Sequence, residues 1–257
     1  MVAISDIIAD LHVHTIASLH ACSTLKECID SAVDNGMKFL AITDHYYDDG
    51  TELYKKNEIT RISRLESRAR HTKANIQVLG GVEFNIGQEI SAWKKLSKVT
   101  WKLIGVHGWF LDCENTSLDE LYQYFASVTG KCDAFAHIER ELHKMKHSVY
   151  GDKLADEVKV FLRKIVDLAK RYDIYLEVNE SSLIDNESGA YERLKYWLEY
   201  AKENENYISL GTDAHYCEEI GNFTNTIRLL NEIDFPKERI LNCNSNLLQK
   251  LMISDDK

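Results

Sequence analysis

The chain has 257 residues, of which 44% are hydrophobic and 28% are charged, and its formal net charge is −10. A chain of this length and composition buries enough apolar surface to fold without a disulfide or a structural metal. The acidic balance argues against a broad nucleic-acid or membrane-binding face, because such a face needs an excess of lysine and arginine. A small cationic pocket is still compatible with it.

The cysteines and the first residues bear on the compartment. The six cysteines are scattered, with no C-x-x-C pair, which is typical of reduced thiols in a cytosol. The start of the chain lacks the basic stretch, apolar run and cleavage site of a signal peptide, and no apolar run approaches the roughly 20 residues of a membrane span. We therefore expect a soluble, cytoplasmic protein. A single proline and no Gly/Ser linker favour one domain over residues 1–257.

Short apolar runs recur along the chain at intervals that leave room for helices. Each run is compact, mostly aliphatic and ends in polar residues, as expected for parallel strands covered on both faces. In chain order they are DIIADLHV (6–13), KFLAITDH (38–45), IQVLGGVEF (76–84), WKLIGVHG (101–108), DAFAHI (133–138), DIYLEVNE (173–180) and YISLGTDAH (207–215).

Helical patterns fill the intervals. Thr24 and Glu27 form a capping-box pattern before an apolar stripe that Gly36 can close. The stretches 155–172 and 191–204 have the apolar spacing of amphipathic helices. About seven βα units predict the α/β class and a distorted (β/α)7 TIM-like barrel. An open doubly wound sheet would need a Gly-rich phosphate turn after the first strand, and the chain has none there.

Nearly every predicted strand ends in a residue that can bind a metal. His12 and His14 are two residues apart, so both rings point to one face of the first strand, and His20 follows after a loop that can fold back over it. The other strand ends contribute His45, Glu83, His107, His137, Asp213 and His215. Because a barrel builds its active site at the carboxyl ends of its strands, we expect these residues to hold metal there.

The size of this set indicates more than one ion. Seven imidazoles and two carboxylates are too many for one zinc ion, which takes four ligands, but they suffice for two or three ions if a carboxylate bridges. Three divalent ions would bring about +6 against −2 from Glu83 and Asp213, which makes the pocket cationic. An anionic substrate is the natural partner, and phosphate is the commonest candidate.

Six segments together resemble the PHP (polymerase and histidinol phosphatase) family, and in particular its stand-alone YcdX-type phosphoesterase branch. They are DLHVHTIASLHACSTL (10–25), AITDH (41–45), GVEFN (81–85), AHIER (136–140), LEVNESS (176–182) and GTDAH (211–215). The resemblance runs from Asp10 to about Leu251. It implies the PHP fold, which is a distorted seven-stranded barrel with a trinuclear metal site, and hydrolysis of phosphoesters.

The resemblance also implies a ligand set for three divalent ions. The first ion would be held by His12, His14, Glu83 and Asp213; Glu83 would bridge to a second ion held by His107 and His137; the third would be held by His20, His45 and His215. Mixed nitrogen and oxygen ligands do not choose between zinc, manganese and iron. The chain departs from the family at Ile138, where proline is usual, and in a longer 139–156 segment.

The expected mechanism is attack on phosphorus by a metal-bridging hydroxide. The residues expected to be catalytic are Glu83, Asp213, His107 and Arg140, the last as a bidentate ligand of phosphate. Asp10 and Asp44, each close to a ligand histidine in sequence, are candidate acceptors that orient the imidazoles. Asn179 and Ser181 are candidate substrate contacts.

Several functions stay open on the sequence alone. The leading one is hydrolysis of a phosphomonoester of a small metabolite, with neither a nucleic acid nor a membrane as partner. A histidinol-phosphate phosphatase and a 3′-to-5′ exonuclease are alternatives within the family, and the acidic charge argues against the exonuclease. An amidohydrolase-type hydrolase also uses H-x-H, but it would need an eighth strand and no His20. A non-catalytic metal-binding regulator would use the same ligands.

Overall fold

The computed structural model describes residues 1–46, 75–87, 99–107, 112, 115–145, 154–184 and 189–253. Seven parallel strands form one sheet in chain order, each paired with the next. They are β1 (Ala9–Val13), β2 (Phe39–Ile42), β3 (Gln77–Asn85), β4 (Trp101–Gly105), β5 (Ala134–Ala136), β6 (Tyr175–Asn179) and β7 (Ile208–Gly211). All seven predicted strands are confirmed, although the run at 101–108 is described only as far as His107.

The sheet closes between its first and last strands. Val13 forms a parallel bridge with Ala214. The backbone N–H of Asp213 donates to the His12 carbonyl at 2.8 Å, and that of His14 donates to the Ala214 carbonyl at 2.9 Å. The predicted barrel is therefore nearly closed, and its seam places the first histidine pair beside the last strand end.

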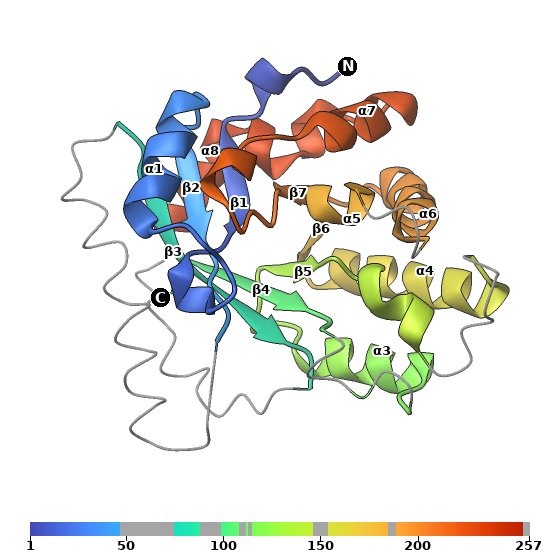
Figure 1. Cartoon of the computed structure of the whole chain (residues 1–257). Helices are drawn as coiled ribbons and strands as arrows, with labels where there is room; N and C mark the ends of the chain where they lie inside the picture. The colour runs from blue at the N-terminus through green and yellow to red at the C-terminus, as the bar shows by residue number, and fades with distance from the viewer. Residues whose placement is uncertain are drawn as a thin grey trace.

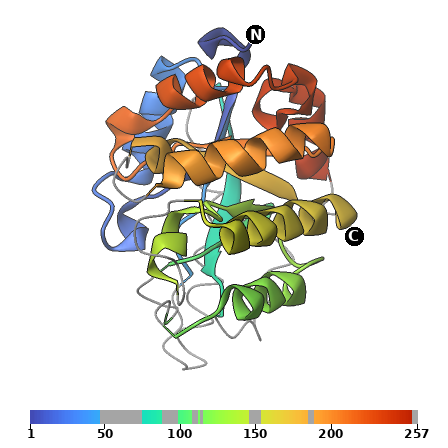
Figure 2. The same cartoon turned by 90° about the vertical axis from the view of Figure 1, so that its right-hand side faces the viewer.

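Helices cover the outside of the barrel. They are α1 (Leu25–Asp34), α3 (Leu118–Ser127), α4 (Asp156–Arg171), α5 (Glu180–Ile184), α6 (Ala190–Glu203), α7 (Thr224–Glu232) and α8 (Ser245–Ile253). Figure 1 shows α1 on one side of the sheet and α3, α4 and α6 on the other. Figure 2 shows α3, α4, α6 and α7 one above another in chain order, as successive βα units of a barrel require.

The predicted helix signals have the expected physical roles. The Thr24 hydroxyl accepts from the Glu27 N–H and the Glu27 carboxylate accepts from the Thr24 N–H, which closes the capping box of α1. In α4 the predicted apolar stripe, which includes Phe161 and Ile165, is buried. Among the described residues, no helix combines the length and the apolar character that crossing a membrane requires.

Alternation along the strands separates the packed base of the barrel from its polar mouth. Leu79 and Glu83 share one face of β3, and Trp101, Leu103 and Gly105 share one face of β4. Leu79, Trp101 and Leu103 belong to one buried apolar cluster, and the Trp101 indole donates to the Leu11 carbonyl at 3.0 Å. The interior is thus filled with apolar side chains below, so that Glu83 lies at the carboxyl end, where active sites of barrels are built.

Candidate metal centre

The carboxyl ends of the strands bring the nine predicted ligands together. Eight of them form four overlapping groups, in each of which the ligand atoms lie within 4.8 Å of one another. The groups are His12–His137–Asp213, His12–His14–Glu83, His14–Asp213–His215 and His45–Glu83–His107. The ninth ligand, His20, has its ring centroid 4.6 Å from that of His215 and 5.1 Å from that of His45.

Glu83 is the centre of this cluster. The side chain is fully buried on β3. Its Oε1 atom lies 2.8 Å from His137 Nε2 and 3.3 Å from His107 Nε2. Its Oε2 atom lies 3.4 Å from the Nε2 atoms of both His12 and His14. The two carboxylate oxygens therefore face different sets of imidazoles, which fits a carboxylate that bridges two ions.

The three histidines expected to hold the third ion lie at the rim. His45 Nδ1 is 3.0 Å from Glu83 Oε2, and His215 belongs to the group that contains Asp213. His20 is exposed and falls in none of the four groups, which cover the described residues alone. The three rings are close to one another, but His45 also faces Glu83 and His215 also lies beside Asp213.

His12 and His14 test whether these residues fit a metal. His12 Nδ1 lies 2.7 Å from a carboxylate oxygen of Glu177. His14 Nδ1 lies 2.8 Å from the hydroxyl of Ser18, which donates its own hydrogen to Asp44 and so accepts from the ring. In the neutral imidazoles both Nε2 atoms then carry lone pairs. These two atoms are 3.0 Å apart, an arrangement that needs a cation or a proton between or beside them.

Electrostatics points the same way. Burial disfavours the charged form of His12, but the carboxylates of Glu177, Asp213 and Glu83 outweigh burial and raise its pKa well above the ordinary value. Burial is likewise outweighed at His14, where Asp213 and Glu83 raise the pKa to about 9. The carboxylates thus attract positive charge to these nitrogens, which a divalent ion with N and O ligands would supply. The residues present fit a metal.

Six of the other predicted ligands have pKa shifts toward the protonation states that metal binding requires. Burial alone would raise the pKa values of Glu83 and Asp213. The surrounding imidazoles outweigh burial at Glu83, and His12 and Arg140 outweigh it at Asp213, so both pKa values lie well below the usual range. Burial is the main cause that lowers the pKa of four imidazoles and keeps them neutral. These are His20, His45, His137 and His215.

Arg140 lies beside the cluster at the start of the 3-10 turn Arg140–Lys144. Its Nη1 donates to Asp213 Oδ2 at 2.9 Å, while Asp213 Oδ1 faces His14 Nε2 at 3.2 Å. Its Nη2 donates to Asn179 Oδ1 at 2.8 Å and to the Ser181 hydroxyl at 2.7 Å. Asn179 and Ser181, expected as substrate contacts, therefore hold the arginine that orients Asp213.

The residues that orient the ligand histidines differ from the prediction. The carboxylate of Asp10 accepts from the Thr212 hydroxyl and N–H and from the Gly221 N–H, so it ties β1 to the loop after β7 instead of contacting an imidazole. Asp44 accepts from the Ser18 hydroxyl, which in turn accepts from His14 Nδ1. Glu177, the acceptor for His12, was missed by sequence reasoning, although its position two residues before Asn179 on β6 places both on one face.

One glycine and the backbone conformation of two predicted ligands show how tightly the site is packed. A Cβ on Gly105 would lie 2.6 Å from His137 Cε1 and 2.7 Å from Glu83 Oε1, so the site occupies the space a side chain would need. His137 and Asp213 have φ of +32° and +58°, in the left-handed region that non-glycine residues seldom adopt. Such strain is found where a functional site needs a particular side-chain direction.

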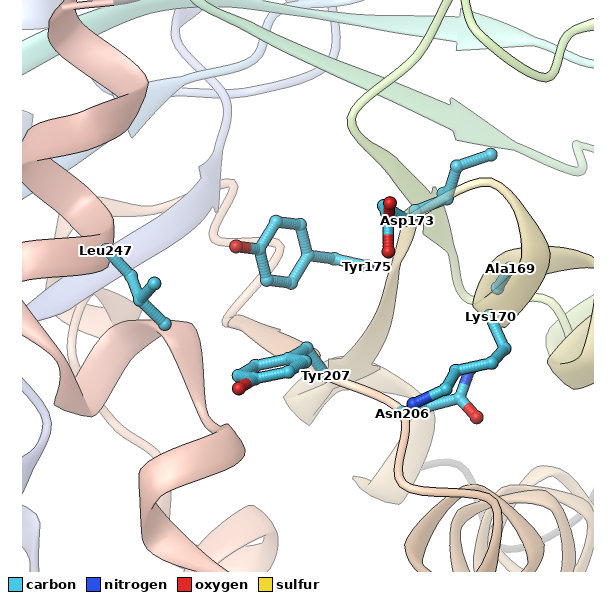
Figure 3. Close-up of a pocket in the computed structure, with 8 residues that line it drawn as sticks. Ala169, Lys170, Asp173, Tyr175, Asn206, Tyr207 and Leu247 are labelled. Atoms are coloured by element: carbon cyan, nitrogen blue, oxygen red, sulfur yellow. The ribbon is translucent and has the colours of Figure 1, made fainter.

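A cleft opens beside the cluster and a separate cavity lies at the other end of the barrel. The cleft, of about 160 Å³, is lined by Asp213, His215 and residues of α5. The cavity, of about 240 Å³, is lined by Tyr175, Tyr207 and Lys170 among others, without a histidine (Figure 3). Tyr175 begins β6 and Tyr207 directly precedes β7, so the cavity lies at the amino ends of these strands, where barrels do not carry their chemistry.

The 139–156 segment is described in part. The sequence predicts that this segment is longer than in the family, and residues 146–153 of it lie outside the described residues. Within the described part, the Glu139 carboxylate is buried and accepts from the Trp197 indole N–H at 3.1 Å. The Arg193 Nε donates to the Glu139 carbonyl at 2.8 Å. Helix α6 therefore anchors the turn that carries His137 and Arg140.

Comparison with known proteins agrees with this geometry. A probable phosphatase of Proteus mirabilis is 30% identical over 241 residues, which cover 91% of this chain and 89% of the relative. A probable phosphatase of Edwardsiella ictaluri is 27% identical over 237 residues, again 91% and 89% of the two chains. Both relatives are named probable phosphatases, in agreement with the activity that the sequence predicts.

A solved structure shares the fold. The histidinol phosphate phosphatase of Lactococcus lactis, in complex with zinc, L-histidinol and phosphate, superposes with a TM-score of 0.61 at 15% identity, covering 90% of this chain and 95% of that one. Residues 10–181, well over half of the chain, match the PHP domain. With this match, the seven-stranded barrel and the histidine-rich mouth, the chain belongs to the PHP domain family.

Proposed function

We propose that the protein is a metal-dependent phosphatase that hydrolyses a phosphomonoester of a small metabolite at a centre of three divalent ions. The observation that carries this proposal is the convergence of seven histidines, Glu83 and Asp213 at the barrel mouth, with the Nε2 atoms of His12 and His14 3.0 Å apart. The names of the relatives, and the phosphate and zinc bound by the Lactococcus lactis structure, support a phosphoester as substrate.

The ligand groups support a particular assignment of the ions. His12, His14, Glu83 and Asp213 would hold one, Glu83 with His107 and His137 a second, and His20, His45 and His215 a third. Bound there, the ions supply positive charge for the phosphoryl oxygens and a nucleophile near neutral pH. Zinc, manganese and iron all suit this donor set.

Arg140 contributes as a fixed positive charge. Of the five N–H groups of an arginine, four bond to protein oxygens here, those of Asp213, Asn179, Ser181 and, at 3.4 Å, Ser182. This geometry favours an arginine that aims Asp213 and adds positive potential beside the phosphoryl group over one that grips phosphate with two N–H groups. The negative charge of the substrate is then attracted to a pocket already oriented to receive it.

The cleft beside Asp213 supports a compact leaving group. Its wall includes Ser181, Ile184, Thr212 and Asn222. As far as the described residues line it, this cleft of about 160 Å³ suits the alcohol of a small metabolite. The Lactococcus lactis structure contains L-histidinol and phosphate, so histidinol phosphate belongs in the test panel.

The proposal is tested by metal analysis combined with an activity assay. We expect two or more ions per chain by mass spectrometry and hydrolysis of p-nitrophenyl phosphate with Mn²⁺ or Zn²⁺. His107→Ala and Asp213→Ala should stay folded and lose nearly all activity, whereas Asp119→Ala, which removes a carboxylate that is 86% exposed on α3, should not. Near-wild-type activity of both site variants would contradict the proposal. Bound ions without hydrolysis of any phosphoester, including single-stranded DNA, would favour the metal-binding regulator.

A further inference from the structure

Strand β6 carries a buried carboxylate that the proposed mechanism does not use. Glu177 is 1% exposed, and its Oε1 lies 2.7 Å from His12 Nδ1. Its Oε2 accepts from the Nδ2 amide of Asn179 at 3.1 Å. Gly211 on the neighbouring strand leaves room for this contact, because a Cβ there would lie 2.4 Å from His12 Cβ and 2.5 Å from Glu177 Oε1. The barrel is thus built to let Glu177 reach His12.

The orientation of the Asn179 amide follows from its other partners. Its Oδ1 accepts from Arg140 Nη2 at 2.8 Å and from the Ser182 N–H at 3.2 Å. A guanidinium and a backbone N–H are donors that cannot accept, so the amide oxygen must face them. The amide nitrogen is then the group that faces Glu177, so the hydrogen-bond partners themselves fix which end of the amide is O and which is N.

We infer that the Glu177–Asn179 pair sets the tautomer of His12. Because Asn179 presents a donor, Glu177 accepts on one oxygen and has its other oxygen left to accept from His12 Nδ1. The proton of the neutral imidazole is therefore on Nδ1, and the lone pair of Nε2 faces Glu83, Asp213 and His14. Glu177 and Asn179 are positioning residues, and their link to ion binding rests on the proposed function.

The variant Glu177→Gln reverses this direction while it preserves the shape of the side chain. A glutamine has one acceptor and one donor group. The Asn179 amide still needs an acceptor, so the glutamine oxygen turns to it and the glutamine NH₂ turns to His12 Nδ1. His12 must then accept at Nδ1 and carry its proton on Nε2, where the proton blocks ligation. We expect zinc affinity to fall ten- to hundredfold, as for lost acceptors of ligand histidines.

The exchanged pair provides the decisive control. In Glu177→Gln with Asn179→Asp, the aspartate accepts from Arg140, from the Ser182 N–H and from the glutamine NH₂, so the glutamine oxygen again accepts from His12. The net charge of the pair is unchanged. Asn179→Asp alone places two carboxylates against each other and should weaken zinc binding. The double variant should regain at least tenfold over Glu177→Gln, which a purely structural role would not produce.

The measurements are zinc calorimetry and long-range ¹H–¹⁵N spectra of the imidazoles in zinc-titrated protein. The spectra should show the His12 proton on Nδ1 in the wild type and in the double variant, and its loss from Nδ1 in Glu177→Gln. The control Asp133→Asn replaces a carboxylate just before β5, at the opposite end of the barrel, that accepts from the Lys102 N–H at 2.8 Å, and it should leave zinc affinity unchanged.

The outcomes separate this inference from the proposed function. Wild-type zinc affinity in Glu177→Gln, or a double variant that binds no better than Glu177→Gln, overturns the inference while the proposed metal centre stands. A wild-type protein that binds no zinc, manganese or iron overturns the proposed function, and the link from tautomer to ligation with it.

Discussion

Replacing Gly105 by alanine should disturb the metal centre although none of the predicted ligand residues is substituted. The new Cβ would lie 2.6 Å from His137 Cε1, 2.7 Å from Glu83 Oε1 and 3.0 Å from His107 Cε1, whereas ordinary contact begins at 3.4 Å. The strand cannot retreat easily, because Gly105 is paired with Asn85 on one side and with Ala136 on the other. The ligand side chains must therefore move, by about 0.8 Å for His137.

The size of the effect follows from that displacement. A misplacement of about 1 Å in an active site lowers the rate about 100-fold, so we expect kcat/KM with p-nitrophenyl phosphate to fall by about that factor. Overpacking a well-packed region lowers the free energy of unfolding by roughly 1–3 kcal/mol. The ion shared by Glu83, His107 and His137 should also bind more weakly, so fewer ions per chain should survive gel filtration.

Three measurements check this prediction: ions per chain by mass spectrometry, steady-state kinetics, and urea unfolding. The matched control is Gly130→Ala, where a Cβ meets no atom within 4 Å but φ is +76°. That variant should lose stability by roughly 1 kcal/mol from backbone strain while it keeps its ions and its kcat/KM. A Gly105→Ala protein with the wild-type ion count and kcat/KM would refute the packing of ligands around this glycine.

Three further outcomes are expected. Ser18→Ala removes the hydroxyl that accepts from His14, so zinc affinity should fall roughly tenfold or more while circular dichroism is unchanged, and equal affinity by calorimetry would contradict the relay. Ion affinity should weaken as pH falls below about 9. The pKa of His14 is raised to about 9, so below that pH a binding ion must displace the protons held by His14 and His12. Calorimetry that shows no proton release on ion binding would refute this. Chelation should lower the Tm, because Glu83 and Asp213 lose a counter-charge, and zinc should restore it; a Tm indifferent to chelation would count against a bound ion.

The fold and the gathering of the nine candidate residues at the barrel mouth were predictable because a few physical signals were strong. Buried parallel strands appear as short aliphatic runs, and histidine is scarce enough that its repeated presence at strand ends, as in His45 and His137, carries information. The seven strands of the structure match those runs. What the sequence could show was which residue types reach the mouth of the barrel.

The sequence could not show the hydrogen bonds between them. Asp10 and Asp44 look equivalent beside their histidines. The loop after β7 brings three donors to Asp10, whereas Asp44 accepts from Thr15 and from Ser18. Arg140 was expected to grip phosphate, which stays a prediction; in the structure its N–H groups bond to Asp213, Asn179 and Ser181, none of which is near it in the sequence. Such outcomes depend on tertiary neighbours far away in the chain, which no local pattern records.

The seam of the barrel has a consequence for biosynthesis. Asp10 and Thr212, which bond across it, are 202 positions apart. A ribosome that adds roughly 5–20 residues per second takes about 10–40 s to cover that distance. During this interval the first two imidazoles have emerged without the aspartate that completes their surroundings. A nascent polypeptide therefore completes its pocket only after β7 and the loop that follows it have been made, and a chain that terminates ahead of β7 lacks both Asp213 and the seam.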